Sequence, residues 1–81
     1  MAEEELKPII EAINDLATEN TLPKNVRIKL EYISEILGDE TDMSIKINKV
    51  LQDLEEISDD SNLQAFNRTQ IWNLISLLES I

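Results

Sequence analysis

The chain has 81 residues, 42% of them hydrophobic, with no cysteine and no histidine. This size suits a single domain over residues 1–81, and the missing residue types exclude disulfides, thiolate metal sites and the commonest general base and metal ligand. Seventeen acidic against seven basic residues give a formal charge of −10, which opposes direct binding to nucleic acid.

The acidic N-terminus and the lack of a long apolar run predict a cytoplasmic protein with no signal peptide and no membrane span. Signal peptides begin with basic residues, and a membrane-spanning helix needs about 18 or more consecutive apolar residues.

Two helices are predicted in the first half of the chain, and together they form hairpin one, about residues 4–37. The first helix is expected to begin between Glu4 and Lys7, because we expect Pro8 to sit only in a first turn. Pro23 is expected to start the second helix, and Gly38, the only glycine, to end it.

The second half predicts hairpin two, about residues 42–80, with Thr41 or Asp42 capping its first helix. Its second helix, about residues 64–80, carries apolar side chains around roughly two-thirds of its circumference, whereas one core-facing stripe needs only about 100°. This helix must therefore be covered on more than one side. The side chains concerned are Phe66, Ile71, Trp72, Leu74, Ile75, Leu77, Leu78 and Ile81.

An internal repeat relates the two halves at a separation of 41 residues. Eleven apolar positions of the first half are matched by apolar positions in the second, and Arg27 is matched by Arg68. Two such hairpins are too few for an open solenoid, so the sequence predicts an all-α, four-helix up-and-down bundle made of two duplicated helical hairpins. A HEAT-like pair of hairpins is the alternative.

Several segments suggest a family: Leu22–Arg27, Leu54–Asp59, Arg68–Trp72 and Ser76–Glu79. With these segments the chain resembles a family of small archaeal proteins catalogued as an uncharacterised protein family. The resemblance covers almost the whole chain and implies an all-helical cytoplasmic domain, but no activity. The family usually has prolines where this chain has Ser61 and Gln64, so the resemblance leaves the rigidity of this turn in doubt.

Nothing in the sequence predicts catalysis, a metal site or a cofactor. Asp39, Glu40 and Asp42 lack the glycine and the terminal glutamate of an EF-hand loop. No lysine falls on a predicted apolar face and no serine has a nearby base, so we expect no enzymatic activity. Arg27 and Arg68 are expected to form ion pairs or to hydrogen-bond to turn carbonyls, with Arg68 also stacking on Trp72.

Among the places where the repeat fails, Phe66, Trp72 and Ile75 of hairpin two are apolar where hairpin one has Asn25, Glu31 and Ser34. These side chains either fill asymmetric space inside the bundle or form a partly exposed interface. The second reading predicts a protein-protein interaction or oligomerisation module, with a protein partner or a second copy bound through residues 64–80. The alternative function is an acidic subunit or decoy that docks on a basic, nucleic-acid-associated protein. The interface candidates are Phe66, Arg68, Trp72, Ile75 and Glu79.

Overall fold

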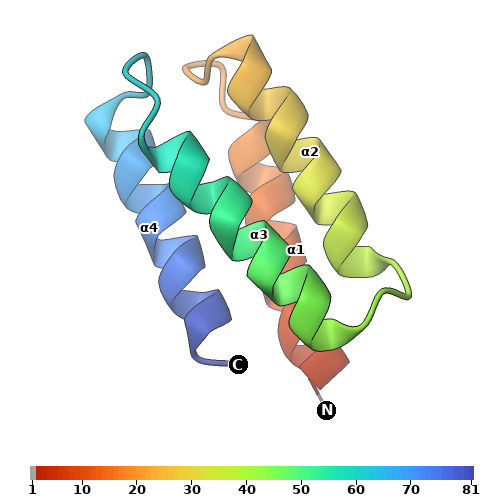
Figure 1. The fold of residues 1–81 in the computed structure, drawn as a ribbon. Helices are drawn as coiled ribbons and strands as arrows, with labels where there is room; N and C mark the ends of the chain where they lie inside the picture. The colour runs from red at the N-terminus through yellow and green to blue at the C-terminus, as the bar shows by residue number, and fades with distance from the viewer. Residues whose placement is uncertain (1) are drawn as a thin grey trace.

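A computed structural model describes residues 2–81, with side-chain surroundings from residue 4 onward, and consists of four α-helices (Figure 1). Helix α1 spans Ala2–Ala17, α2 spans Lys24–Gly38, α3 spans Met43–Ser58 and α4 spans Ala65–Glu79. The described part of the chain contains no strand. The predicted all-α class is therefore confirmed.

The helices form an up-and-down bundle that measures 35 × 19 × 17 Å along its principal axes. Each helix packs against two others, and α1 meets α4 as well as α2, which closes the ring. Figure 1 shows the turns at 18–23 and 59–64 at one end of the bundle, and the turn at 39–42 beside the chain ends at the other. The closed ring confirms the four-helix bundle rather than an open pair of hairpins.

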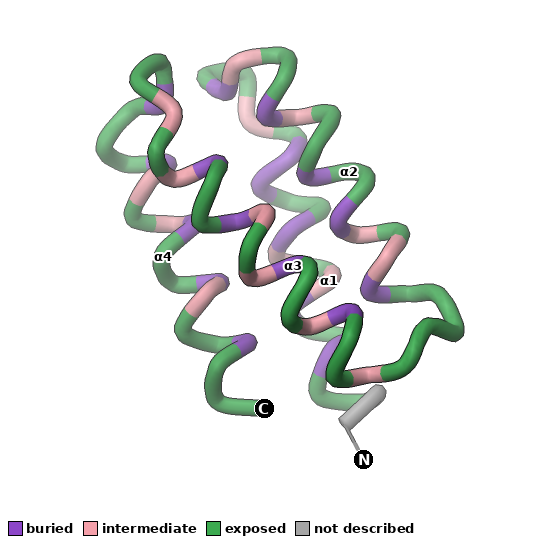
Figure 2. The backbone as a smooth tube through the Cα atoms, viewed as in Figure 1, coloured by how far each residue is buried: buried purple, intermediate pink, exposed green. Residues whose placement is uncertain are grey.

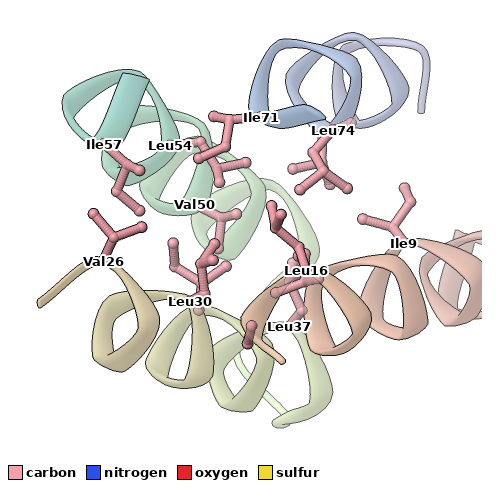
Figure 3. Packing of buried hydrophobic residues seen from close by; sticks show 14 of the residues in the cluster. Ile9, Leu16, Val26, Leu30, Leu37, Val50, Leu54, Ile57, Ile71 and Leu74 are labelled. Carbon is pink, nitrogen blue, oxygen red and sulfur yellow. The ribbon is translucent and has the colours of Figure 1, made fainter. Parts of the chain in front are cut away.

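The core lies along the bundle axis, and every helix contributes to it at spacings of three or four residues (Figures 2 and 3). The repeat matches buried apolar residues with buried apolar residues in seven pairs: Ile9/Val50, Ile13/Leu54, Leu16/Ile57, Leu22/Leu63, Leu30/Ile71, Ile33/Leu74 and Leu37/Leu78. The leucines Leu22 and Leu63 come from the turns at one end. They close that end of the core.

Helix α1 begins earlier than the sequence predicts. It starts at Ala2, so that Pro8 lies inside the helix rather than in its first turn. Pro8 is exposed, whereas Leu6 in the preceding turn is buried in the core. Burial of Leu6 favours continuing the helix through Pro8, although proline removes one helical hydrogen bond.

The helix boundaries at α2 and α3 use different chemistry. Pro23 is the residue before α2 and makes no side-chain cap, and Gly38 ends this helix without a left-handed conformation. Asp42 caps α3. Its Oδ1 accepts hydrogen bonds from the backbone N–H of Ser44 at 3.1 Å and from the hydroxyl of Ser44 at 2.9 Å. The Ser44 hydroxyl, followed by the backbone N–H groups of Ile45 and Ser44, lowers the pKa of Asp42.

The turn between α2 and α3 is held by two further contacts to Asp39. Its carboxylate accepts from the Thr41 backbone N–H at 2.8 Å, which lowers the pKa of Asp39. Its backbone carbonyl accepts from Lys46 Nζ at 2.9 Å. The side chain of Lys46 is almost fully buried, which contradicts the expectation that no lysine lies on an apolar face. Its aliphatic stem packs inward while the amine reaches the helix end.

Candidate functional site

Helix α4 differs from the rest of the acidic molecule in charge. It carries only two charged side chains, Arg68 and Glu79, which compensate each other. The three turns, by contrast, hold six acidic residues and no basic one. The surface of α4 is therefore a weakly charged region on a molecule with a formal charge of −10.

The same helix exposes large apolar side chains. Phe66 is 67% exposed, Trp72 53% and Leu77 49%. Ile75 is half-buried and packs against the core. Of Phe66, Trp72 and Ile75, Ile75 thus fills space in the bundle, whereas the other two remain mostly in contact with solvent.

The predicted interface residues do not lie on one side of α4. At about 100° per residue, Phe66 and Trp72 are separated by about 120° around the helix axis. We refer to Arg68, Trp72, Ile75 and Glu79 as the Trp72 edge. Phe66 instead shares its side of the helix with residues that sequence reasoning did not select, and we refer to this side as the Phe66–Leu77 face: Phe66, Gln70, Asn73 and Leu77.

A shallow groove borders the Phe66–Leu77 face. It lies between α1 and α4 and has a volume of about 200 Å³. Its walls are apolar except for the amides of Gln70 and Asn73; the lining residues are Ala12, Leu16, Gln70, Asn73, Leu74 and Leu77. The face and the groove together form the apolar, uncharged part of the α4 surface.

Two equivalent arginines fix the starts of α2 and α4. Arg68 donates from Nε to the Ser58 carbonyl at 2.8 Å and from Nη2 to the carbonyls of Asp60 and Leu63, at 3.1 and 3.3 Å. Arg27 donates from Nη2 to the Glu19 carbonyl at 3.1 Å. Both arginines bind turn carbonyls, one of the two roles expected from the sequence. The one ion pair among the described side chains is Lys49–Asp53.

A buried polar network at the start of α4 was not predicted. Asn67 is fully buried. Its Oδ1 accepts from the Thr21 hydroxyl at 3.2 Å, and its Nδ2 donates to Gln70 Oε1 at 3.0 Å. The internal repeat could have predicted the burial of Asn67, because Asn67 is the equivalent of the buried Val26. The network ties the turn at 18–23 to α4 and orients the amide of Gln70.

A second hollow lies at the opposite end of the bundle. It has a volume of about 500 Å³ and is formed by α1, the end of α2 and the following turn, with Lys46 at its wall. Among the described side chains, no three potential metal ligands come together, there or elsewhere. No described helix is long and apolar enough to cross a membrane.

Comparison with known proteins gives a family for the chain. A family model described as "Uncharacterised protein family (UPF0147)" matches residues 1–81. The chain belongs to this family. A UPF0147 protein of Archaeoglobus fulgidus is 37% identical over 81 residues, which are all of this chain and 93% of that protein. A UPF0147 protein of Methanothermobacter thermautotrophicus is 33% identical over 82 residues, all of this chain and 80% of that protein.

The comparison confirms the family resemblance found in the sequence, including its archaeal relatives. No solved structure matches the chain. The names of these UPF0147 relatives state the family and no activity.

Proposed function

We propose that this chain is a protein-protein interaction module of the cytoplasm that binds through α4 and has no catalytic role. The observation that carries the proposal is the combination on α4 of large exposed apolar side chains with almost no charge. Exposed apolar groups that cluster on one element favour a protein interface, and aromatic residues are frequent anchors there.

The Trp72 edge supplies one part of this surface. Trp72 offers a half-exposed indole, while Arg68 and Glu79 lie on the same side of the helix at its two ends. An apolar anchor between a base and an acid suits a partner that carries the opposite order of charges. Arg68 is already bonded to three carbonyls, so its guanidinium is held in place before binding.

Retention of proteins from a native cell extract tests the proposal. The tagged chain is compared with a Trp72→Glu, Leu77→Glu variant and with an Ile28→Glu, Tyr32→Glu variant, in which two exposed apolar residues of α2 change in the same way. We expect the unaltered chain and the α2 variant to retain the same proteins and the α4 variant to lose them. Equal retention by all three would contradict the proposal. Circular dichroism checks that each variant is folded.

A second candidate function uses the acids instead. The six acidic residues of the turns lie at the two ends of the bundle, and three of them, Asp39, Glu40 and Asp42, fall within four residues. This distribution favours docking on a basic, nucleic-acid-associated protein. Such a complex should weaken steeply with added salt, whereas binding through α4 should not.

A further inference from the structure

We infer that the Phe66–Leu77 face joins two copies of this chain in an antiparallel, two-fold symmetric dimer. In this dimer Phe66 of one copy packs against Leu77 of the other, and Gln70 lies against Asn73. The inference rests on the proposed function, since it names a partner for the same helix. It does not use the Trp72 edge, which stays open to other proteins.

The face has the pattern that two-fold pairing requires. Its residues follow one another at steps of four, three and four, which keeps them on one side of a helix. The outer pair, Phe66 and Leu77, and the inner pair, Gln70 and Asn73, share one midpoint, between positions 71 and 72. A two-fold axis through this midpoint brings apolar against apolar and amide against amide.

The inner pair can bond across such an axis. A side-chain amide carries both a donor and an acceptor, so Gln70 and Asn73 are complementary. The buried Asn67 already donates to Gln70 Oε1 at 3.0 Å, so the oxygen of this amide is engaged inside the molecule and its nitrogen is the group that can donate across the axis. The polar network inside the bundle thus leaves the amide nitrogen of Gln70 as a donor for Asn73 of the second copy.

The lack of charge on this face permits a second copy as the occupant. Two molecules that each carry a formal charge of −10 repel one another wherever their acids meet. The Phe66–Leu77 face has no charged residue, and the acids of the turns lie at the ends of the bundle. The face itself therefore brings no like charges of the two copies together.

The neighbouring groove gives the aromatic ring of the other copy a place to pack. Its volume is about 200 Å³, and four of its six lining residues are apolar. Leu77 and Leu74 line it from α4, and Ala12 and Leu16 line it from α1. Because Phe66 of the second copy lies opposite Leu77 in the dimer, its ring reaches this groove.

The equivalent face of hairpin one lacks these properties. The repeat matches Phe66 with Asn25 and Gln70 with Lys29. Asn25 donates to Asp60 Oδ2 at 3.3 Å, so its side chain connects the start of α2 to the turn at 59–64 of the same molecule. A charged lysine and an occupied amide stand where α4 offers an open ring and a neutral amide. The sequence has therefore made only one of two equivalent faces self-complementary.

Sedimentation velocity of the purified full chain over a range of micromolar concentrations tests the dimer. We expect a concentration-dependent change from monomer to dimer, which Phe66→Glu or Leu77→Glu weakens by about 30-fold or more. Ile28→Glu is the matched control, because Ile28 is 56% exposed on α2 and acquires the same charge. We expect this control to associate like the unaltered chain.

Disulfide trapping tests the register of the two helices. Because the chain has no native cysteine, only the introduced cysteines can form disulfides. Gln70→Cys and Asn73→Cys chains are oxidised separately and as a mixture, and we expect the mixed disulfide to dominate. Preferential Asn73→Cys homodimers would overturn the antiparallel register. A chain that remains monomeric at every concentration would overturn the dimer. If α4 still retained other proteins from the extract, the proposed function would stand without it.

Discussion

Asn67 occupies a place in the core that hairpin one fills with Val26. A buried amide is tolerated only when its donor and acceptor are paired, and Asn67 pairs both, with Gln70 and with Thr21. Thr21 belongs to the turn of the other hairpin. A residue that breaks the repeat therefore connects the two halves that the repeat created.

This arrangement predicts opposite responses at two equivalent positions. Val26→Asn should lower the free energy of unfolding by about 2–4 kcal/mol, because it buries an amide without arranged partners. Asn67→Val should change it by no more than about 1 kcal/mol, since Thr21 is exposed and can bond to water instead. Urea denaturation followed by circular dichroism measures both. A similar loss in the two variants would show that the core does not distinguish the positions in this way.

Single residues were the part of the structure that the sequence predicted least completely. The bonds of Arg27 and Arg68 to turn carbonyls could be anticipated, because an arginine that follows a turn has free carbonyls within reach. Lys46 and Asn67 could not be placed from hydropathy, which assigns both to the surface. Their burial depends on partners from distant turns or on a helix end, and periodicity does not report such partners.

At the scale of the element, α1 shows tertiary packing overriding a local signal. Pro8 removes the hydrogen bond that its nitrogen would donate, and its ring crowds the preceding turn. The helix nevertheless extends from Ala2, with Leu6 buried upstream and Ile9 buried downstream of the proline. The apolar contacts of both turns with the core oppose the cost of the proline.

Replacing this proline should therefore stabilise the molecule. Pro8→Ala restores one backbone donor at an exposed position, and we expect the free energy of unfolding to rise by up to about 3 kcal/mol. Thermal unfolding followed by circular dichroism gives the change in Tm. An unchanged or lower Tm would favour a helix start between Glu4 and Lys7, which is the start that the sequence alone predicts. Lys7→Ala, one residue earlier at another exposed position, is the control.

The elements themselves followed largely from the sequence. Apolar spacing located all four helices, and the repeat identified seven pairs of equivalent core residues. The surface of α4 was only partly predictable: its excess of apolar residues was visible, but the comparison with hairpin one drew attention to Trp72 and away from Leu77. Leu77 is matched by an apolar residue, Ile36, so a test based on differences between the halves misses it.

At the scale of the whole molecule, the excess of negative charge destabilises the folded bundle. Seventeen acids face seven bases, and among the described side chains only Lys49 and Asp53 form an ion pair, at 3.3 Å. The excess negative charge repels itself more strongly in the folded bundle than in an extended chain. Asp39 and Asp42 gain backbone hydrogen bonds that oppose this repulsion, whereas the side chain of Glu40 between them has no hydrogen bond with the described residues.

Added salt should therefore stabilise the bundle. Screening shortens from about 30 Å at 0.01 M to about 3 Å at 1 M, so sodium chloride weakens repulsion between the turns. We expect Tm to rise by about 4–8 °C over this range, equivalent to about 1 kcal/mol for a chain of this size. Glu40→Gln should raise Tm at low salt and reduce the dependence on salt, while Thr41→Gln, beside it, should do neither. A Tm that falls with salt would mean that attractive pairs outweigh repulsion.

Self-association through the uncharged face, measured on the same samples, should strengthen with salt or stay constant. The reason is that salt screens the charges that oppose the approach of two copies.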